Sequence, residues 1–317
     1  MKKFLLVLLF ILGILVYAFY SEQTRFKISA PMEDFEYKKN IILTSKHRTY
    51  KLENLRNLVG PNELKRIMEE NDDNVEIYTP SEKNIKNGVF RANFHMHTTN
   101  SDGRAKVEQL FNQAQEYAEK NLNGKPIYIG ITDHNTVLGA KEAVAVLQRN
   151  PKKYKNIKVI TGIEIFTAYK TKFSKRPIDI HVLTLCIIPY DEFLNKEFYK
   201  KNLKDVWNRT YPDRDFNRVI SFMSDYGIVG IAHPARYLEH LGNDKENYIK
   251  ELLNTYKNEN KNKILFLEGY YQVYHLITPK FDDEFKSFLS FINTEANKLG
   301  IYRTGSTDTH GLSIFKK

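Results

Sequence analysis

The sequence contains a single cysteine, Cys186, among its 317 residues. One thiol can form neither an intramolecular disulfide nor a zinc site built from several cysteines. Cys186 lies in the apolar run HVLTLCII, a position typical of a buried core residue. A metal site within this chain would therefore use histidine and carboxylate ligands.

Long blocks of one charge are also absent, as are aromatic–basic repeats, solenoid-type repeats and low-complexity tracts. Nucleic acid is thus a possible partner that the sequence does not specifically indicate. The net charge of +10 and the pI of about 9.3 favour anionic partners such as phosphate esters, nucleic acid or a lipid surface. A lysine-rich surface with no such partner explains the same charge equally well.

The N-terminus begins with two lysines and continues with an uncharged, apolar run at residues 4–20. Residues 1–20 are predicted to be a signal anchor or a signal peptide, with Ala18 as a possible cleavage site. The run spans about 26 Å as a helix, nearly a bilayer core, which favours the anchor slightly. We expect a single-pass protein of the cell membrane with its remainder extracytoplasmic, or an exported, periplasmic protein if the signal is cleaved. No cysteine follows the run, which argues against a lipid anchor.

Residues 21–88 form a polar N-terminal extension. NIILTS is a candidate strand, and GPNELKRIMEEN is a candidate helix with Pro61 near its start. The extension carries no fingerprint of function, and we interpret it as a spacer that packs on the main domain.

Residues 89–317 alternate strand-like apolar runs with amphipathic segments. The strand candidates are VFRANFHMH, IYIGITDH, VITGIEIF, IDIHVLTLCII, IVGIAHP, ILFLEGYY and YRTGSTDTH. The helix candidates include RAKVEQLFNQAQEYAEKN, NTVLGAKEAVAVLQRN, RDFNRVISFMSDYG and FDDEFKSFLSFINTEANKLG, which ends at the C-cap residue Gly300. This alternation predicts an α/β fold of parallel βα units, and seven units in a row favour a closed (β/α) barrel.

Histidine or acidic residues occur at or near every predicted strand end. They are His95 and His97 with Asp102, then His134, Glu164, His181, His233, Glu268, and Asp308 with His310. The C-terminal strand ends of such a barrel converge on one face, where active sites form. A lone His-x-His pair is more often a surface or core pair than a metal site. The joint pattern differs, because burying so many charges without metal would be very costly.

Histidines and carboxylates without cysteine suit Zn, Mn or Fe. The nine histidines and acids other than Glu268 are too many for one ion, and they would hold two or three divalent ions. Such a site can clamp the attacking and departing oxygens and generate hydroxide from water near neutral pH.

The motifs FHMHTTNSDGR, GITDHNT, TGIEIF, DIHVLTL, GIAHPAR and GSTDTHG, in this order, resemble the polymerase-and-histidinol-phosphatase (PHP) domain family. The resemblance covers residues 89–317 and implies a distorted barrel of seven βα units. It also implies a metal-dependent phosphoesterase that hydrolyses phosphate mono- or diesters, of nucleotides or other small phosphorylated substrates, through a hydroxide bridging the ions.

The resemblance implies three metal sites. The first ion would be held by His95, His97, Glu164 and Asp308. Glu164 would bridge to a second ion held by His181 and His233. Asp102, His134 and His310 would hold the third, with an aspartate where family members have either Asp or His.

Several further roles are hypotheses. Asp308 is a candidate proton acceptor, Arg236 a candidate bidentate partner for phosphate, and Arg104 a second such candidate. Asp133 should face away from the ligands and orient one of them, whereas Glu268 should hydrogen-bond a ligand or a water. For each arginine, a surface salt bridge is the competing interpretation.

Two other functions remain open. The metal site could hydrolyse a bond other than a phosphate ester. Alternatively, the chain could be a membrane-tethered, metal-binding module without catalysis, which its basic charge and its apolar N-terminal run would also suit. The substrate, the native metal and the oligomeric state are not determined by the sequence.

Overall fold

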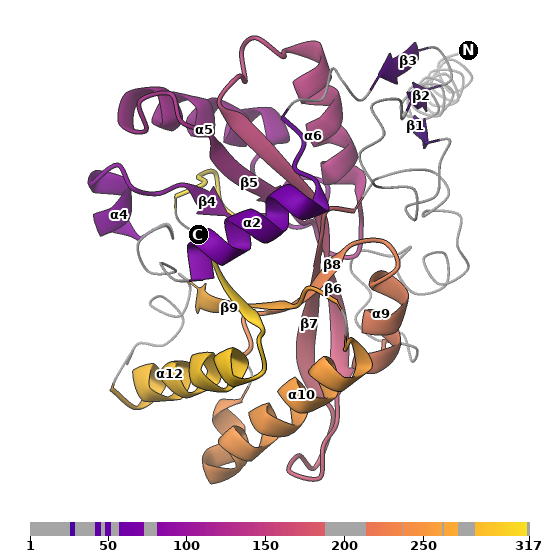
Figure 1. Ribbon diagram of the computed structural model, residues 1–317, viewed down its shortest axis with the longest axis vertical. Helices are drawn as coiled ribbons and strands as arrows, with labels where there is room; N and C mark the ends of the chain where they lie inside the picture. The colour runs from indigo at the N-terminus through magenta and orange to yellow at the C-terminus, as the bar shows by residue number, and fades with distance from the viewer. Residues whose placement is uncertain are drawn as a thin grey trace, which may run out of the picture.

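The main sheet of the computed structural model is curved and carries helices around it (Figure 1). The structure describes residues 26–28, 42–45, 48–51, 57–72, 81–187, 214–236, 238–261, 263–271 and 283–315. Residues 1–20, where a signal peptide or anchor is predicted, lie outside the described residues. Among the described helices, none is both long and apolar enough to cross a membrane.

The main sheet has seven strands in the order β10-β9-β8-β7-β6-β5-β4. Their bounds are β4 (Ala92–Asn93), β5 (Ile127–Ile131), β6 (Ile157–Tyr169), β7 (Ile178–Leu185), β8 (Ile228–Ala232), β9 (Phe266–Tyr271) and β10 (Tyr302–Ser306). Each strand lies within one of the runs expected to form it or overlaps that run closely. Their near-continuous burial explains why these runs are almost wholly apolar.

The two edge strands approach each other just beyond their C-terminal ends. Met96 forms a parallel bridge with Thr309, and the His97 amide donates a hydrogen bond to the Thr309 carbonyl at 3.0 Å. The sheet is therefore a nearly closed barrel, and it closes at the end where the predicted ligands lie.

The prediction that all seven strands are parallel is wrong for β7. This strand runs antiparallel to both neighbours, β6 and β8. Residues 170–177 connect β6 to β7 as a hairpin, and a hairpin needs no crossover helix. His181 consequently lies in the first half of its strand, opposite Phe166 and Ala232, and still reaches the rim formed by the C-terminal ends of the parallel strands.

Helices cover the outside of the sheet (Figure 1). They are α4 (Glu82–Lys86), α5 (Val107–Asn121), α6 (Leu138–Arg149), α9 (Phe216–Met223), the 3-10 helix η3 (Glu239–Asp244), α10 (Lys245–Glu259) and α12 (Asp283–Lys298). Helix α5 buries Leu110, Phe111, Ala114 and Ala118, the three-to-four spacing of one helical face. Gly300 follows α12 with a φ of +64°, which confirms the expected glycine cap.

The N-terminal extension contributes to the barrel itself. Helix α2 (Pro61–Asp72), at the predicted position, buries Leu64, Ile67 and Met68 in a cluster that also contains Cys186. Cys186 is thus the core residue that the sequence indicated. The packed fold therefore includes residues 57–72, which lie before the predicted boundary at residue 89. A separate small sheet contains β1 (Phe26–Ile28), β2 (Ile42–Ser45) and β3 (Arg48–Lys51), with β2 inside the run NIILTS.

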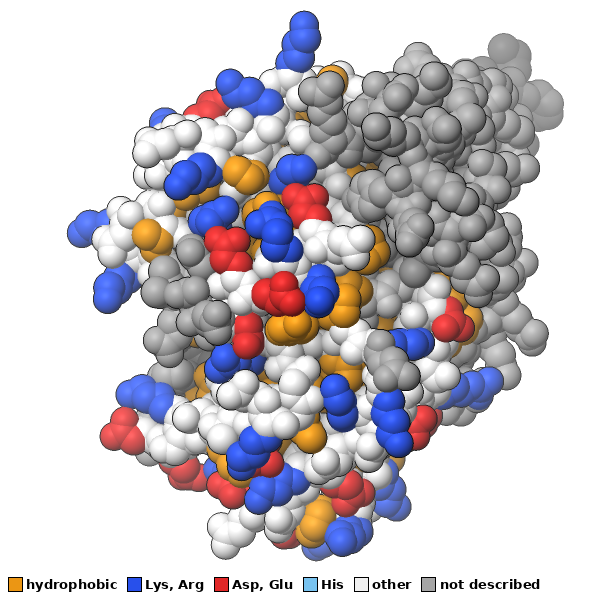
Figure 2. All heavy atoms as spheres, viewed as in Figure 1, with side chains coloured by type: hydrophobic (Ala, Val, Ile, Leu, Met, Phe, Trp, Pro, Cys, Tyr) orange, Lys and Arg blue, Asp and Glu red, His pale blue; other side chains and the backbone are white. Residues whose placement is uncertain are grey.

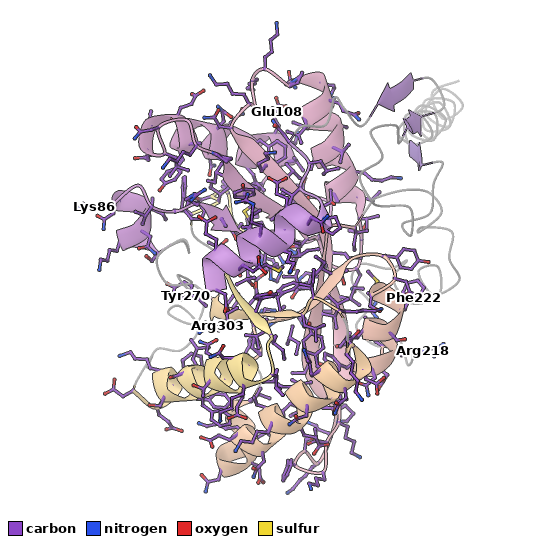
Figure 3. The ribbon with its side chains drawn as sticks, viewed as in Figure 1. Lys86, Glu108, Arg218, Phe222, Tyr270 and Arg303 are labelled. Carbon is purple, nitrogen blue, oxygen red and sulfur yellow. The ribbon has the colours of Figure 1, made fainter. Side chains whose placement is uncertain are left out.

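A partly buried ion pair links α2 to strand β10 of the sheet. The Arg303 side chain, labelled in Figure 3, donates from Nε to Asp72 Oδ1 at 2.8 Å. On the face that carries α2, charges of both signs are interspersed (Figure 2). The described residues on this face therefore form no extended patch of one sign.

Candidate metal centre

The predicted ligands converge at the rim where the barrel closes. His95 and His97 follow β4, His134 follows β5, and His233 follows β8, whereas Glu164 and His181 lie within β6 and β7. Asp308 and His310 follow β10, and Asp102 lies in the loop after His97. All nine residues are members of one contiguous cluster of contacts.

The first group of ligand atoms comes from His95, His97, Glu164 and Asp308. His95 Nε2 lies 2.9 Å from His97 Nε2, 3.0 Å from Glu164 Oε2 and 3.3 Å from Asp308 Oδ1. His97 Nε2 lies 3.2 Å from Glu164 Oε2 and 2.9 Å from Asp308 Oδ1. An ion with ligands at about 2.0–2.1 Å in tetrahedral geometry would separate them by about 3.3 Å. The four atoms fit one such ion.

The orientation of these atoms also fits a metal. Glu164 Oε2 is buried and makes no hydrogen bond to the described residues, although His95 Nε2 is only 3.0 Å away. His97 Nδ1 and His134 Nδ1 are likewise buried without a hydrogen bond to the described part of the chain. Buried polar atoms are nearly always hydrogen-bonded, so lone pairs that converge without bonding indicate a ligand between them.

Glu164 connects the first group to a second. Its other oxygen, Oε1, lies 2.8 Å from His181 Nδ1 and 2.9 Å from His233 Nε2. The carboxylate therefore faces one set of ring nitrogens with each oxygen, which is the arrangement of a bridging ligand. His134 Nδ1 also lies 2.9 Å from Glu164 Oε2, so His134, Glu164 and His181 form a further possible metal group.

A third group surrounds Asp102. Asp102 Oδ2 lies 3.1 Å from His310 Nε2 and 3.6 Å from His134 Nε2, and Asp102 Oδ1 lies 3.7 Å from His97 Nδ1. His97 thus belongs to this group as well as the first, which the sequence did not indicate. The Asp102 and His310 side chains are 24% and 21% exposed, whereas all ligands of the first group are at most 1% exposed.

The electrostatics of the centre keep both carboxylates ionised. Burial alone would raise their pKa values, but the surrounding histidines hold the pKa of Glu164 and of Asp308 well below the usual range. Burial lowers the pKa of His134 and of His233 to about 4, against the attraction of Glu164. Ionised carboxylates and neutral imidazoles are the forms that bind a metal ion.

The pKa of His97 is shifted in the opposite direction. Burial favours the neutral ring, yet hydrogen bonds to Asp308 and Glu164 raise its pKa to about 9. Without a metal, a proton on His97 would partly compensate the charge of these two carboxylates. A bound cation would supply that compensation in its place.

Glu268 holds two of the predicted ligands in position. Its Oε1 lies 3.0 Å from His95 Nδ1, and its Oε2 accepts the His233 amide N–H at 2.7 Å. Ser306 donates its hydroxyl to the same Oε1. Because Glu268 holds the Nδ1 side of the His95 ring, His95 Nε2 points toward the first group. This agrees with the prediction that Glu268 hydrogen-bonds a ligand.

Asp133 was expected to orient a ligand, but its carboxylate instead accepts hydrogen bonds from the loop that follows His97. Its carboxylate accepts the Thr98 amide at 2.7 Å, the Thr98 hydroxyl at 2.8 Å and the Ser101 hydroxyl at 2.6 Å. A Cβ at Gly139 would lie 1.8 Å from Asp133 Oδ2, so only glycine allows this approach. Asp133 thus fastens the loop that carries Asp102.

The two candidate phosphate-binding arginines lie differently. Arg236 is 25% exposed, and its Nη1 lies 3.4 Å from the Tyr271 hydroxyl and 3.5 Å from Asp308 Oδ2. The Arg104 side chain is exposed, and its backbone amide donates a hydrogen bond to the His310 carbonyl at 2.9 Å. Tyr271 was not singled out as a site residue from the sequence, which offered only a tyrosine-rich strand end.

Comparisons with known proteins identify a family and two similar solved structures. The family model described as "PHP domain" matches residues 93–292. One solved structure that is similar is an amidohydrolase from Chromobacterium violaceum with bound sulfate and no metal, at 16% identity and a TM-score of 0.46. A second is a candidate metal-dependent phosphoesterase from Bifidobacterium adolescentis, at 16% identity and a TM-score of 0.45. Both alignments cover 70% of this chain and 88% of the other. No curated protein matches the chain.

Proposed function

Because the chain belongs to the PHP domain family and gathers its histidines and acids into adjoining groups, we propose that it is a metal-dependent phosphoesterase. The observation that carries the proposal is Glu164, whose two oxygens face two different sets of imidazole nitrogens. A carboxylate shared in this way suits two ions held close together, the arrangement that hydrolyses phosphate esters. The substrate is a small phosphorylated molecule, a mono- or diester.

The residues would hold two or three divalent ions, with Zn, Mn or Fe the best match to nitrogen and oxygen ligands. His95, His97, Glu164 and Asp308 hold the first. When bound, the ions supply Lewis acidity and a nucleophile derived from water. His181 and His233 hold the second with Glu164, and Asp102, His134 and His310 hold the third. Glu268 keeps the His95 ring oriented throughout.

Among the described residues, Arg236 is the cation best placed to bind the substrate. It lies beside the first group, and its side chain is 25% exposed, so a phosphoryl oxygen could approach its guanidinium. A guanidinium there would stabilise negative charge on the equatorial oxygens of the transferring phosphoryl group.

The proposed location is extracytoplasmic. The support is the apolar run at residues 4–20 behind two lysines, which would tether the catalytic domain to the cell membrane or direct its export. A topology assay that fuses a periplasm-dependent reporter after residue 317 tests this location. An inactive periplasm-dependent reporter, together with an active cytoplasm-dependent reporter fused at the same position, would overturn it.

The test of the activity uses the full chain purified in mild detergent without chelator. Release of phosphate from nucleotides and sugar phosphates, and of p-nitrophenol from p-nitrophenyl phosphate and bis-p-nitrophenyl phosphate, is measured with added Mn²⁺, beside His97→Ala. Release by the wild type alone supports the proposal. Two or more ions per chain without release from any ester would favour another bond or a binding role, and carboxyl-ester, lactone and amide substrates then distinguish these.

A further inference from the structure

Tyr271 lies beside the metal centre, and no role has been assigned to it so far. Its side chain is 1% exposed, and its hydroxyl donates a hydrogen bond to Asp308 Oδ2. Arg236 Nη1 lies 3.4 Å from the same hydroxyl. The hydroxyl therefore contacts a predicted ligand and lies within reach of the predicted phosphate-binding arginine.

An irregularity in β9 brings Tyr271 to this position. Glu268 pairs with Thr304, but Tyr270 pairs with Gly305 and Tyr271 with Ser306, so Gly269 is the extra residue of a bulge. In a regular strand, side chains two apart share a face, and Glu268 and Tyr271 would point to opposite faces. The bulge reverses this alternation, so both reach the metal centre.

The bulge also requires a residue without a side chain at position 269. A Cβ at Gly269 would lie 2.5 Å from Asn293 Oδ1 and 3.0 Å from Arg303 Cβ. Tyr270, labelled in Figure 3, is left partly exposed, whereas Glu268 and Tyr271 are both buried. The local structure thus selects Tyr271, and not its neighbour, for the contact with Asp308.

The two oxygens of Asp308 have different partners. Oδ1 lies 2.9 Å from His97 Nε2 and 3.3 Å from His95 Nε2, within the first group of ligand atoms. Oδ2 accepts the Tyr271 hydroxyl and lies 3.5 Å from Arg236 Nη1. A hydrogen bond to one oxygen limits rotation of the carboxylate and leaves the other oxygen to bind the ion.

We propose that Tyr271 is a positioning residue for Asp308, which directs Oδ1 to the first ion and withholds Oδ2 from proton transfer. The inference rests on the proposed function, in which Asp308 is a metal ligand. It also modifies one hypothesis from the sequence: with Oδ2 engaged by a donor, Asp308 serves as a ligand and not as the proton acceptor.

The test compares Tyr271→Phe with a matched control, Tyr256→Phe. Tyr256 is equally buried, and its hydroxyl donates only to backbone carbonyls, that of Val229 at 2.7 Å and that of Phe266 at 3.2 Å. The affinity of each metal-free full-length protein for Zn²⁺ is measured by competition with a chromophoric chelator. The visible absorption spectrum of the Co²⁺-loaded protein is recorded in parallel.

Tyr271→Phe is expected to weaken the tightest binding step by about 10- to 100-fold and to shift the Co²⁺ spectrum. Tyr256→Phe should change neither, even if both variants melt at a lower temperature. Equal affinities and spectra for the two variants would overturn the proposal, as would a Tyr271→Phe protein that does not fold. If the wild type binds no metal, the proposed function fails instead, so the two failures are distinguishable.

Discussion

The side chains of Glu164 and His181 meet diagonally across the antiparallel strands β6 and β7, with Oε1 2.8 Å from Nδ1. The reversed direction of β7 makes this contact possible, because it brings the first half of the strand to the rim where the predicted ligands lie. Glu164 Oε2 simultaneously faces His95. The centre of the site is therefore a single carboxylate placed between ligands from parallel and antiparallel strands.

Replacing Glu164 with glutamine is expected to reduce both metal content and activity. The amide carries no charge and cannot bridge two cations through two anionic oxygens. We expect the loss of at least one ion per chain, and a fall in phosphate release of about 100-fold or more. Elemental analysis of the purified protein and initial rates measure these effects. Glu70→Gln is the control, since Glu70 pairs with Arg91 on the face of α2.

Removal of the ions should lower thermal stability. Ligands that bind only the folded state contribute about 2.7 kcal/mol at 100 times their Kd, and a protein of this size loses about 2–4 °C per kcal/mol. A chelator should therefore lower the melting temperature by about 5–10 °C. Readdition of Mn²⁺ or Zn²⁺, but not of K⁺, should restore it in a thermal shift assay. An unchanged melting temperature at saturating metal would contradict the assignment of these groups as metal ligands.

Asp133→Asn should selectively weaken the third group. The amide accepts fewer hydrogen bonds from Thr98 and Ser101, so the loop that carries Asp102 is less well ordered. We expect the weakest of the metal-binding steps to lose about 10-fold in affinity, while the tightest is unchanged. Metal titration followed by calorimetry separates the steps. Asp225→Asn, at an exposed ion pair with Lys263, should leave every step unaltered.

Arg236→Ala should affect substrate binding more than the metals. The lost guanidinium would have paired with phosphate, so KM should rise by about 10-fold, while the metal content stays at the wild-type value. Arg236→Lys keeps the charge but loses the bidentate geometry, so its KM should lie between those of the wild type and Arg236→Ala. Steady-state kinetics and elemental analysis on the same preparations test this. A normal KM in Arg236→Ala would show that another cation holds the substrate.

The smallest stable catalytic fragment should begin before residue 61. Helix α2 buries Leu64, Ile67 and Met68, and each such side chain contributes about 1.5–3 kcal/mol. Their sum is comparable to the entire stability of an ordinary domain, about 5–15 kcal/mol. Residues 57–317 should thus be soluble and melt cooperatively, whereas residues 89–317 should aggregate. Equal melting temperatures for the two fragments would refute a structural role for α2.

Local patterns determined most elements and most members of the clustered histidines and acids. Each of the seven apolar runs predicted to form a strand contains or overlaps one, because a strand buried on both faces requires apolar residues throughout. The histidines and acids at the ends of these runs converge because strand ends meet at one rim of a barrel. The predicted role of Glu268 followed from the same reasoning and is confirmed by its contacts with His95 and His233.

The tertiary structure decided which group each of these residues belongs to and in which direction its side chain points. Strand direction is not encoded in a run of apolar residues, so the reversal of β7 could not be derived from the pattern alone. The bulge at Gly269 depends on space beside Asn293 and Arg303, and it changes which tyrosine faces Asp308. The double role of His97 likewise depends on distances set by three separate strand ends. The sequence by itself specified which chemical groups gather, because periodicity and residue type are local properties. Only packing determined which atoms meet, since that depends on segments far apart in the chain.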